Sequence, residues 1–310
     1  GLNFNFNISY NRAKIDKLAG GQTWQSSNWG GKPAGQNDFF IEEGGRLGEV
    51  YGYELDGFYT TDDFSWDGSK WILNENLTDP TELIKYNNFG PGSLKLKADE
   101  DGKFTKKRLG NTVPTVTGGF GINMRYKNFD LSAFFNYSLG NKIVNATKLG
   151  SSYYNDTKKG WNLNDNFTLA KRYSWIDPST GENMLKSSYI KSNGLDYTIN
   201  RLNEINAGAS MYNPGSITEM PLLDWAVEDG SFLRVNNISI GYTLPKVFVN
   251  KMFMQNVRIY VTGYNLYCFT KYSGADPEVD TRRSTPMTPG VDYSAYPKSR
   301  SFVGGINVTF

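Results

Sequence analysis

SFVGGINVTF, residues 301 to 310, is the stretch that decides the fold class of this 310-residue chain. Its alternate positions Phe302, Gly304, Ile306, Val308 and Phe310 are mainly apolar, and the positions between them are mostly small or polar. A strand with this period of two separates an apolar environment from a watery one. Both a membrane-spanning strand and a half-buried strand of a soluble sandwich meet that description.

The same alternation recurs along the chain. Further strands are predicted at 2–10, 49–59, 116–126, 129–139, 232–244 and from 257 onward. With the last strand this makes about seven. Lys127-Asn128 is a tight turn between two of these stretches and predicts a hairpin. Most of these strands run to about ten residues or more, long for a soluble sheet and suitable for a tilted bilayer crossing.

Composition narrows the class of protein. Hydrophobic residues make up 38%, aromatic residues 15%, and the mean hydropathy is −0.52. No segment can therefore form a membrane helix, which needs about 20 successive apolar residues. A transmembrane barrel is compatible with such averages because every second residue faces water. The formal charge of +2 gives no support for nucleic-acid binding.

Catalysis has little support in the sequence. The chain contains no histidine, which removes Ser-His-Asp chemistry and histidine-ligated zinc. Its single cysteine, Cys268, rules out an internal disulfide framework. A hydrolase based on two carboxylates would need a pair with suitable spacing, and no such pair stands out. We therefore expect no enzyme, no cofactor and no resident metal.

Connection lengths predict an orientation for a membrane barrel. If the last strand ends at the periplasm, long connections near 61–114, 141–230 and 270–299 fall on the extracellular side. The short links at 127–128 and 245–256 fall on the periplasmic side, as in known barrels. The segment 13–46 fits poorly, because the same count places it at the periplasm.

Several sequence blocks resemble one family. GSFLRVNNISIGYTLP (230–245), VRIYVTGYNLYCFTKYSGADPEV (257–279) and YPKSRSFVGGINVTF (296–310) are similar to SusC/RagA-type TonB-dependent transporters of the Bacteroidetes. Upstream of these, the blocks at 48–59 and 113–145 are similar to further blocks of the family, and all five occur in the family's order. The resemblance covers nearly all of the chain and is to the family's C-terminal part.

This resemblance implies an architecture. Such transporters are plugged barrels of about 22 strands in the Gram-negative outer membrane. The chain would be an all-β, antiparallel C-terminal portion of about 7–10 strands, spanning residues 1–310. The plug and N-terminal strands would lie outside it, because unpaired strand edges are not tolerated in lipid. Phe310 would then serve as the outer-membrane insertion signal.

The resemblance also implies function and partners. The whole protein would import oligosaccharides or peptides under a SusD-like surface lipoprotein that acts as a lid. TonB-ExbB-ExbD would supply energy through the N-terminal part. The alternative is a soluble or surface-displayed all-β carbohydrate-binding module whose aromatic residues stack on sugars.

Aromatic residues supply the candidate ligand contacts. All seven tryptophans lie outside the predicted strand cores. From the 141–230 connection, Trp161 and Trp175 together with Tyr153 and Tyr154 are the candidate stacking platforms. The alternative is that these rings pack the connections or form an interfacial girdle.

Polar residues of the strands supply candidate contacts with a plug. Because side chains alternate along each predicted strand, Arg125, Asp130 and Arg258 are expected on the inward face. Half-buried arginines there need hydrogen-bond acceptors.

Two acidic stretches are candidate cation sites. The stretch 97–110 resembles a calcium loop, but Lys97 and Arg108 occupy its coordinating ends, so no calcium is expected there. Asp276, Glu278 and Asp280 are expected to order their loop, with Arg282 and Arg283 as potential partners.

Overall fold

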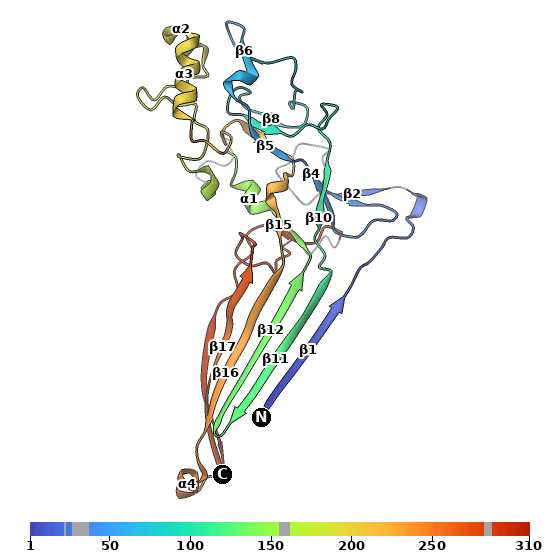
Figure 1. Ribbon diagram of the computed structural model, residues 1–310, viewed down its shortest axis with the longest axis vertical. Helices are drawn as coiled ribbons and strands as arrows, with labels where there is room; N and C mark the ends of the chain where they lie inside the picture. The colour runs from blue at the N-terminus through green and yellow to red at the C-terminus, as the bar shows by residue number, and fades with distance from the viewer. Residues whose placement is uncertain (22, 27–36, 155–161, 282–286) are drawn as a thin grey trace.

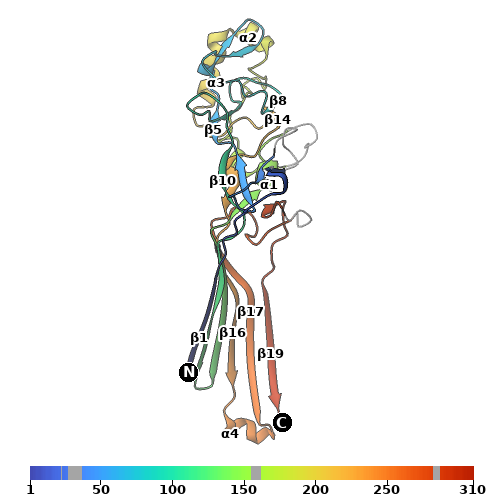
Figure 2. The ribbon, with the colours of Figure 1, turned by 90° about the vertical axis from the view of Figure 1, so that its right-hand side faces the viewer.

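The computed structural model describes residues 1–21, 23–26, 37–154, 162–281 and 287–310. Its main element is an open antiparallel sheet of six strands in the order β1-β11-β12-β16-β17-β19. The strands are β1 (Leu2–Tyr10), β11 (Val116–Tyr126), β12 (Phe129–Leu139), β16 (Phe232–Thr243), β17 (Asn256–Thr270) and β19 (Ser301–Thr309). Figure 1 shows this sheet below a second group of elements, and Figure 2 shows it as a single layer with β1 and β19 at its edges.

The predicted hairpin is confirmed. Strands β11 and β12 pair along their full length, from Tyr126 opposite Phe129 to Val116 opposite Leu139. Lys127 takes a φ of 52° in the two-residue turn, which matches the twist of the flanking strands.

The pairing register gives the sheet two different faces. Leu2, Met124, Leu131, Ile240, Val261 and Gly304 occupy the same side of successive strands. This apolar face also carries Phe4 (62% exposed), Ile306 (64%) and Phe302 (72%). The polar face carries mainly Asn, Ser, Thr and Gly, with Arg125, Asp130 and Arg258 at its lower end.

The alternation is preserved through an irregularity at Asn236. In β16, Val235 pairs with Phe135 and Asn237 pairs with Phe134, so Asn236 is an extra residue. In a regular strand Val235 and Ile238, which are three positions apart, would lie on opposite faces, because side chains alternate along a strand. The bulge therefore keeps both side chains on the apolar face.

Connections of very different length leave the two ends of the sheet. The residues between β1 and β11, between β12 and β16, and between β17 and β19 all join strands at the upper end. Only the 127–128 turn and the link after β16 lie at the lower end, where Figure 1 places α4 (Lys246–Val249) beside the C-terminus.

The prediction of one long strand at 49–59 is wrong. This stretch forms β4 (Glu49–Gly52) and β5 (Leu55–Phe58), which belong to different small sheets in the upper group. Val50 and Tyr53 are buried there, so the alternation reflects a local core. The large sheet consequently has six strands rather than about seven. The described residues of segment 13–46 then lie at the same end as the other long connections, which removes the poor fit.

The upper group, which we call the upper unit, is built from short elements. Its sheets are β10-β4-β3-β2, β15-β13-β18, β14-β8, β5-β9 and β6-β7. Their bounds are β2 (Trp24–Ser26), β3 (Phe39–Ile41), β6 (Phe64–Trp66), β7 (Trp71–Leu73), β8 (Lys85–Tyr86), β9 (Leu94–Leu96), β10 (Lys107–Asn111), β13 (Lys142–Asn145), β14 (Ile217–Glu219), β15 (Val227–Asp229) and β18 (Val291–Asp292). The helices are α1 (Ala146–Gly150), α2 (Ser187–Asn193) and α3 (Leu195–Ile205).

Two hydrophobic clusters hold the upper unit together. One includes Val50, Leu149, Met220 and Leu223, and draws on all the long connections. The other packs Leu202 of α3 against aromatic side chains such as Tyr59. Among the described residues, no helix has the length and apolar character needed to cross a membrane.

Candidate functional site

A charged bridge crosses the lower end of the polar face. Arg258 of β17 donates from Nε to Asp130 Oδ1 at 2.9 Å and from Nη2 to Oδ2 at 2.5 Å. Strand β16 lies between the two partners, and Gly241 occupies the crossing point. A Cβ at Gly241 would lie 2.5 Å from Arg258 Nη2, so the bridge requires glycine there.

The three polar residues predicted from parity are brought together. Arg125 lies directly opposite Asp130 in the β11–β12 register and is exposed. Arg258 finds its acceptor within this chain and also lies over the ring of Tyr260, 5.0 Å from the centroid. Asp130 thus lies between the two arginines, hydrogen-bonded to Arg258 and opposite Arg125.

A second ion pair attaches the 271–300 connection to the sheet. Arg234 of β16 contacts Asp276 at 2.6 Å through Nη2 and Glu278 at 2.7 Å through Nε. Arg234 and Asp276 are both buried, and Lys298 adds a 2.5 Å contact to Glu278. For Asp276 and Glu278 the expected role in ordering the loop fits this arrangement, whereas the buried Oδ1 of Asp280 has no hydrogen-bond partner among the described residues. Arg282 and Arg283, their predicted partners, lie outside the described residues.

Glu228 attaches the same connection at a second point. It accepts hydrogen bonds from the amide and hydroxyl of Ser273 and pairs with Lys148 of α1 at 3.1 Å. Burial favours a higher pKa for Glu228, but the Ser273 donors and Lys148 outweigh it and lower the pKa. Stability from this group is thus present above the unfolded pKa and is lost as the pH falls through the folded pKa.

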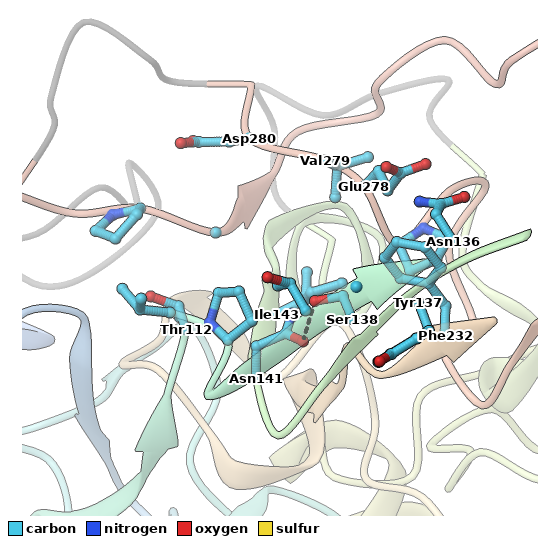
Figure 3. Close-up of a pocket in the computed structure, with 17 residues that line it drawn as sticks. Thr112, Asn136, Tyr137, Ser138, Asn141, Ile143, Phe232, Glu278, Val279 and Asp280 are labelled. Atoms are coloured by element: carbon cyan, nitrogen blue, oxygen red, sulfur yellow. Dashed lines mark hydrogen bonds between the residues drawn. The ribbon is translucent and has the colours of Figure 1, made fainter. Parts of the chain in front are cut away.

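A cavity of about 470 Å³ lies where the sheet meets the upper unit, and Figure 3 shows the residues that line it. Asn136 of β12 lines it together with Glu278, Val279 and Asp280 of the 271–300 connection. Ser138 and Asn141 are hydrogen-bonded to each other at 3.4 Å. Asn136 Oδ1 and Asp280 Oδ1 are buried and have no hydrogen-bond partner within the described residues. They can accept hydrogen bonds from hydroxyl, amide or ammonium groups of a ligand.

Among the described residues, the predicted aromatic platforms do not form one surface. Trp175 is 6% exposed and donates its indole N–H to the Pro91 carbonyl at 2.7 Å. Tyr153 is 3% exposed, and burial raises its pKa to about 12. Their burial does not fit the stacking role expected of them. Tyr154 is 43% exposed, and Trp161 lies outside the described residues.

The loop at 97–110 is organised by its own side chains. Asp99 Oδ1 accepts hydrogen bonds from the backbone N–H groups of Asp101 and Lys103. Across the described part of the chain, no group of three or more acidic or cysteine side chains is arranged to hold a metal ion. At the other end of the molecule, the side chain of Phe310 is 78% exposed.

Comparison with known proteins identifies relatives over nearly the whole chain. TonB-dependent receptor P3 of Formosa agariphila is 31% identical over 98% of this chain and 26% of its own length. TonB-dependent receptor SusC of Bacteroides thetaiotaomicron is 23% identical over 98% of the chain and 24% of its own length. No protein-family model matches the chain.

The fold comparison agrees with the sequence comparison. The RagAB peptide importer in its closed-closed state matches 100% of this chain and 27% of its own chain, with a TM-score of 0.56 and 22% identity. The RagAB peptide transporter matches with a TM-score of 0.55 and 20% identity. The chain thus spans about a quarter of the length of the curated relatives it matches.

A double-mutant cycle tests the bridge. Asp130→Ala and Arg258→Ala should each destabilise the protein, and the double variant should be little worse than either. We expect a coupling of about 1.5–3 kcal/mol, because the hydrogen bonds are between charged groups and half-buried. The measurement is the urea midpoint of the full-length protein in detergent.

The matched control for this cycle is the neutral pair Thr262–Ser239, joined at 2.8 Å on neighbouring strands of the same face. Thr262→Val with Ser239→Ala should give a smaller coupling, about 0.5–1.5 kcal/mol. Strict additivity of Asp130→Ala and Arg258→Ala would contradict the bridge.

Loss of Arg234 should release the 271–300 connection. Arg234→Met leaves Asp276 as an unpaired buried carboxylate and should cost about 3–5 kcal/mol. Hydrogen–deuterium exchange should rise in residues 271–281 and 287–300. The control Lys298→Met removes a half-exposed cation and should cost less than about 1 kcal/mol. Equal exchange in the two variants would show that Arg234 does not order the connection.

Proposed function

Because the chain is a relative of the SusC/RagA-type TonB-dependent receptors, we propose that it forms the C-terminal part of the barrel wall of an outer-membrane importer. The whole protein takes up oligosaccharides or peptides, and this part has no catalytic role. The two-faced sheet is the observation that carries the proposal.

The apolar face supports a position in lipid. It extends across all six strands, and side chains such as Leu2 (74% exposed) and Phe269 (56%) have no protein layer over them. Exposed apolar surface of this extent is unfavourable in water, whereas it is the requirement for a barrel exterior. It also argues against the soluble carbohydrate-binding module, whose apolar face would be covered by a second sheet.

The open edges support a larger barrel. Strands β1 and β19 end the six-stranded sheet, and each has one edge without a sheet partner among the described strands. In lipid such edges must be paired, so further strands of the same protein would close the wall. The polar face would then line the lumen, with Arg125 contacting a plug domain. Charge reversal at Arg125 that left the plug in place would remove this part of the proposal.

The upper unit is proposed to be extracellular and to meet the cargo. Long connections at one end and short ones at the other follow the rule for outer-membrane barrels. A SusD-like lipoprotein would cover the upper unit, while TonB-ExbB-ExbD would act from the periplasm through the N-terminal part. The cavity between Asn136 and Asp280 is the proposed cargo contact within this chain.

Purification through this chain tests the assignment. From native outer membranes, we expect a complex that requires detergent and contains a plug-bearing portion and a SusD-like lipoprotein in similar amounts. Mass spectrometry of the co-purified ligand would identify an oligosaccharide or a peptide. Recovery of the chain alone, monomeric in a detergent-free soluble fraction, would refute the barrel assignment and favour the binding module.

The cavity can be tested with the ligand recovered from that complex. Asn136→Ala or Asp280→Ala should weaken its binding to the full-length importer by about three- to tenfold, the effect of losing one hydrogen bond. Asn123→Ala is the matched control, since Asn123 lies on the same polar face but does not line the cavity. Unchanged affinity in both cavity variants would exclude this cavity as a cargo contact.

A further inference from the structure

The link between β16 and β17 presents apolar side chains at the lower end of the molecule. It contains α4 and a short 3₁₀ helix (Asn250–Met252), followed by Phe253. Val247 is 70% exposed, Phe248 60%, Met252 46% and Phe253 93%. Exposed apolar side chains gathered on one short segment indicate a contact surface.

The link is fixed to the sheet at several points. Val249 is 1% exposed, so one side of α4 is buried. The backbone N–H of Leu244 donates to the Val257 carbonyl at 2.8 Å, and that of Gln255 donates to the Thr309 carbonyl at 2.7 Å. Phe253 has a φ of 55°, a left-handed conformation that costs energy for a bulky residue. The fold therefore holds the exposed rings in place.

The position of the link relative to the strand ends indicates what covers the link. Tyr126, Phe129 and Tyr242 lie at the lower end of the apolar face, and the rings of Phe129 and Tyr242 are 4.7 Å apart. Aromatic side chains concentrate at the boundary between acyl chains and headgroups. Three residues, Thr243, Leu244 and Pro245, separate Tyr242 from α4, and Figure 2 places α4 directly below the strand ends.

We propose that residues 246–253 form a membrane-interface anchor that binds phospholipid at the lower, periplasmic edge of the sheet. Val247, Phe248, Met252 and Phe253 enter the boundary of the acyl chains, and the exposed Lys246 and Lys251 meet the lipid phosphates. Apolar and basic residues in one short segment are the composition that binds such a surface. This inference rests on the proposed function, because it requires the apolar face to lie in lipid.

Depth measurements on the full-length protein test the anchor. In a Cys268→Ser background, a fluorophore is attached to Phe248→Cys or Phe253→Cys. The protein is reconstituted into vesicles of phosphatidylethanolamine and phosphatidylglycerol. We expect the label's fluorescence to be quenched by a lipid that carries its quencher near the headgroup. Iodide in the water, which quenches the label in the unfolded protein, should no longer quench it.

The matched control is Asn250→Cys, an exposed polar position in the same link. Its label should stay open to iodide. Labels at 248 and 253 that are as open to iodide as the label at 250 would overturn the anchor. Labels shielded from both iodide and lipid would show that protein covers the link, which also overturns it.

A label at Ile240→Cys separates this inference from the proposed function. Ile240 is 56% exposed on the apolar face and lies two residues farther from the link than Tyr242. A quencher deep in the acyl chains should reach it if the sheet is a barrel wall. Deep quenching at 240 with free iodide access at 248 and 253 would refute the anchor alone, whereas no lipid quenching at 240 would refute the membrane assignment itself.

Discussion

The register of six strands is the constraint on which the molecule depends. Because side chains alternate along a strand, a slip of one residue at any pairing would move apolar residues onto the polar face. The extra residue Asn236 shows how the constraint is met where the sequence breaks its alternation. The two adjacent asparagines, Asn236 and Asn237, bring Val235 and Ile238 onto one face. The consistent apolar face is thus a property of the pairing as much as of the composition.

The polar face adds specific contacts to this register. The bridge from Arg258 to Asp130 passes over Gly241 and therefore fixes three strands relative to one another. At the other end, Arg234 fixes the 271–300 connection through Asp276 and Glu278, and Glu228 holds it again through Ser273. The upper unit is consequently joined to the sheet by side-chain contacts as well as by the chain. A cavity lined from both parts can then keep a defined shape.

The sequence predicted the large sheet well because its signal is local. Alternation over about ten residues identifies a strand without knowledge of its neighbours, as for β11 and β12. The same signal failed at 49–59, where Tyr51, Tyr53 and Leu55 alternate across two short strands of a buried core. Burial of that kind depends on residues far along the chain, such as Leu223, which a local pattern does not include.

The candidate site was predicted only in part for the same reason. Parity placed Asp130 and Arg258 on one face, but their direct pairing joins residues 128 positions apart. Trp175 and Tyr153 were singled out because rings in long connections often bind ligands, yet tertiary packing buries both. The unpaired oxygens of Asn136 and Asp280 had no sequence signal, since an unsatisfied acceptor is recognised only when all its neighbours are known.

Many side chains of the polar face are small, and this bears on the proposed lumen. Gly119, Gly121 and Gly305 lie on this face together with many serine and asparagine residues. The side chain of Tyr260 passes over Gly305, where a Cβ would come within 2.5 Å of its ring. Small side chains project little from the sheet and leave its backbone exposed, so a folded domain can approach the sheet closely. In the proposed importer, such a wall would hold a plug by few specific contacts, chiefly at Arg125, and still allow it to move when energy is supplied.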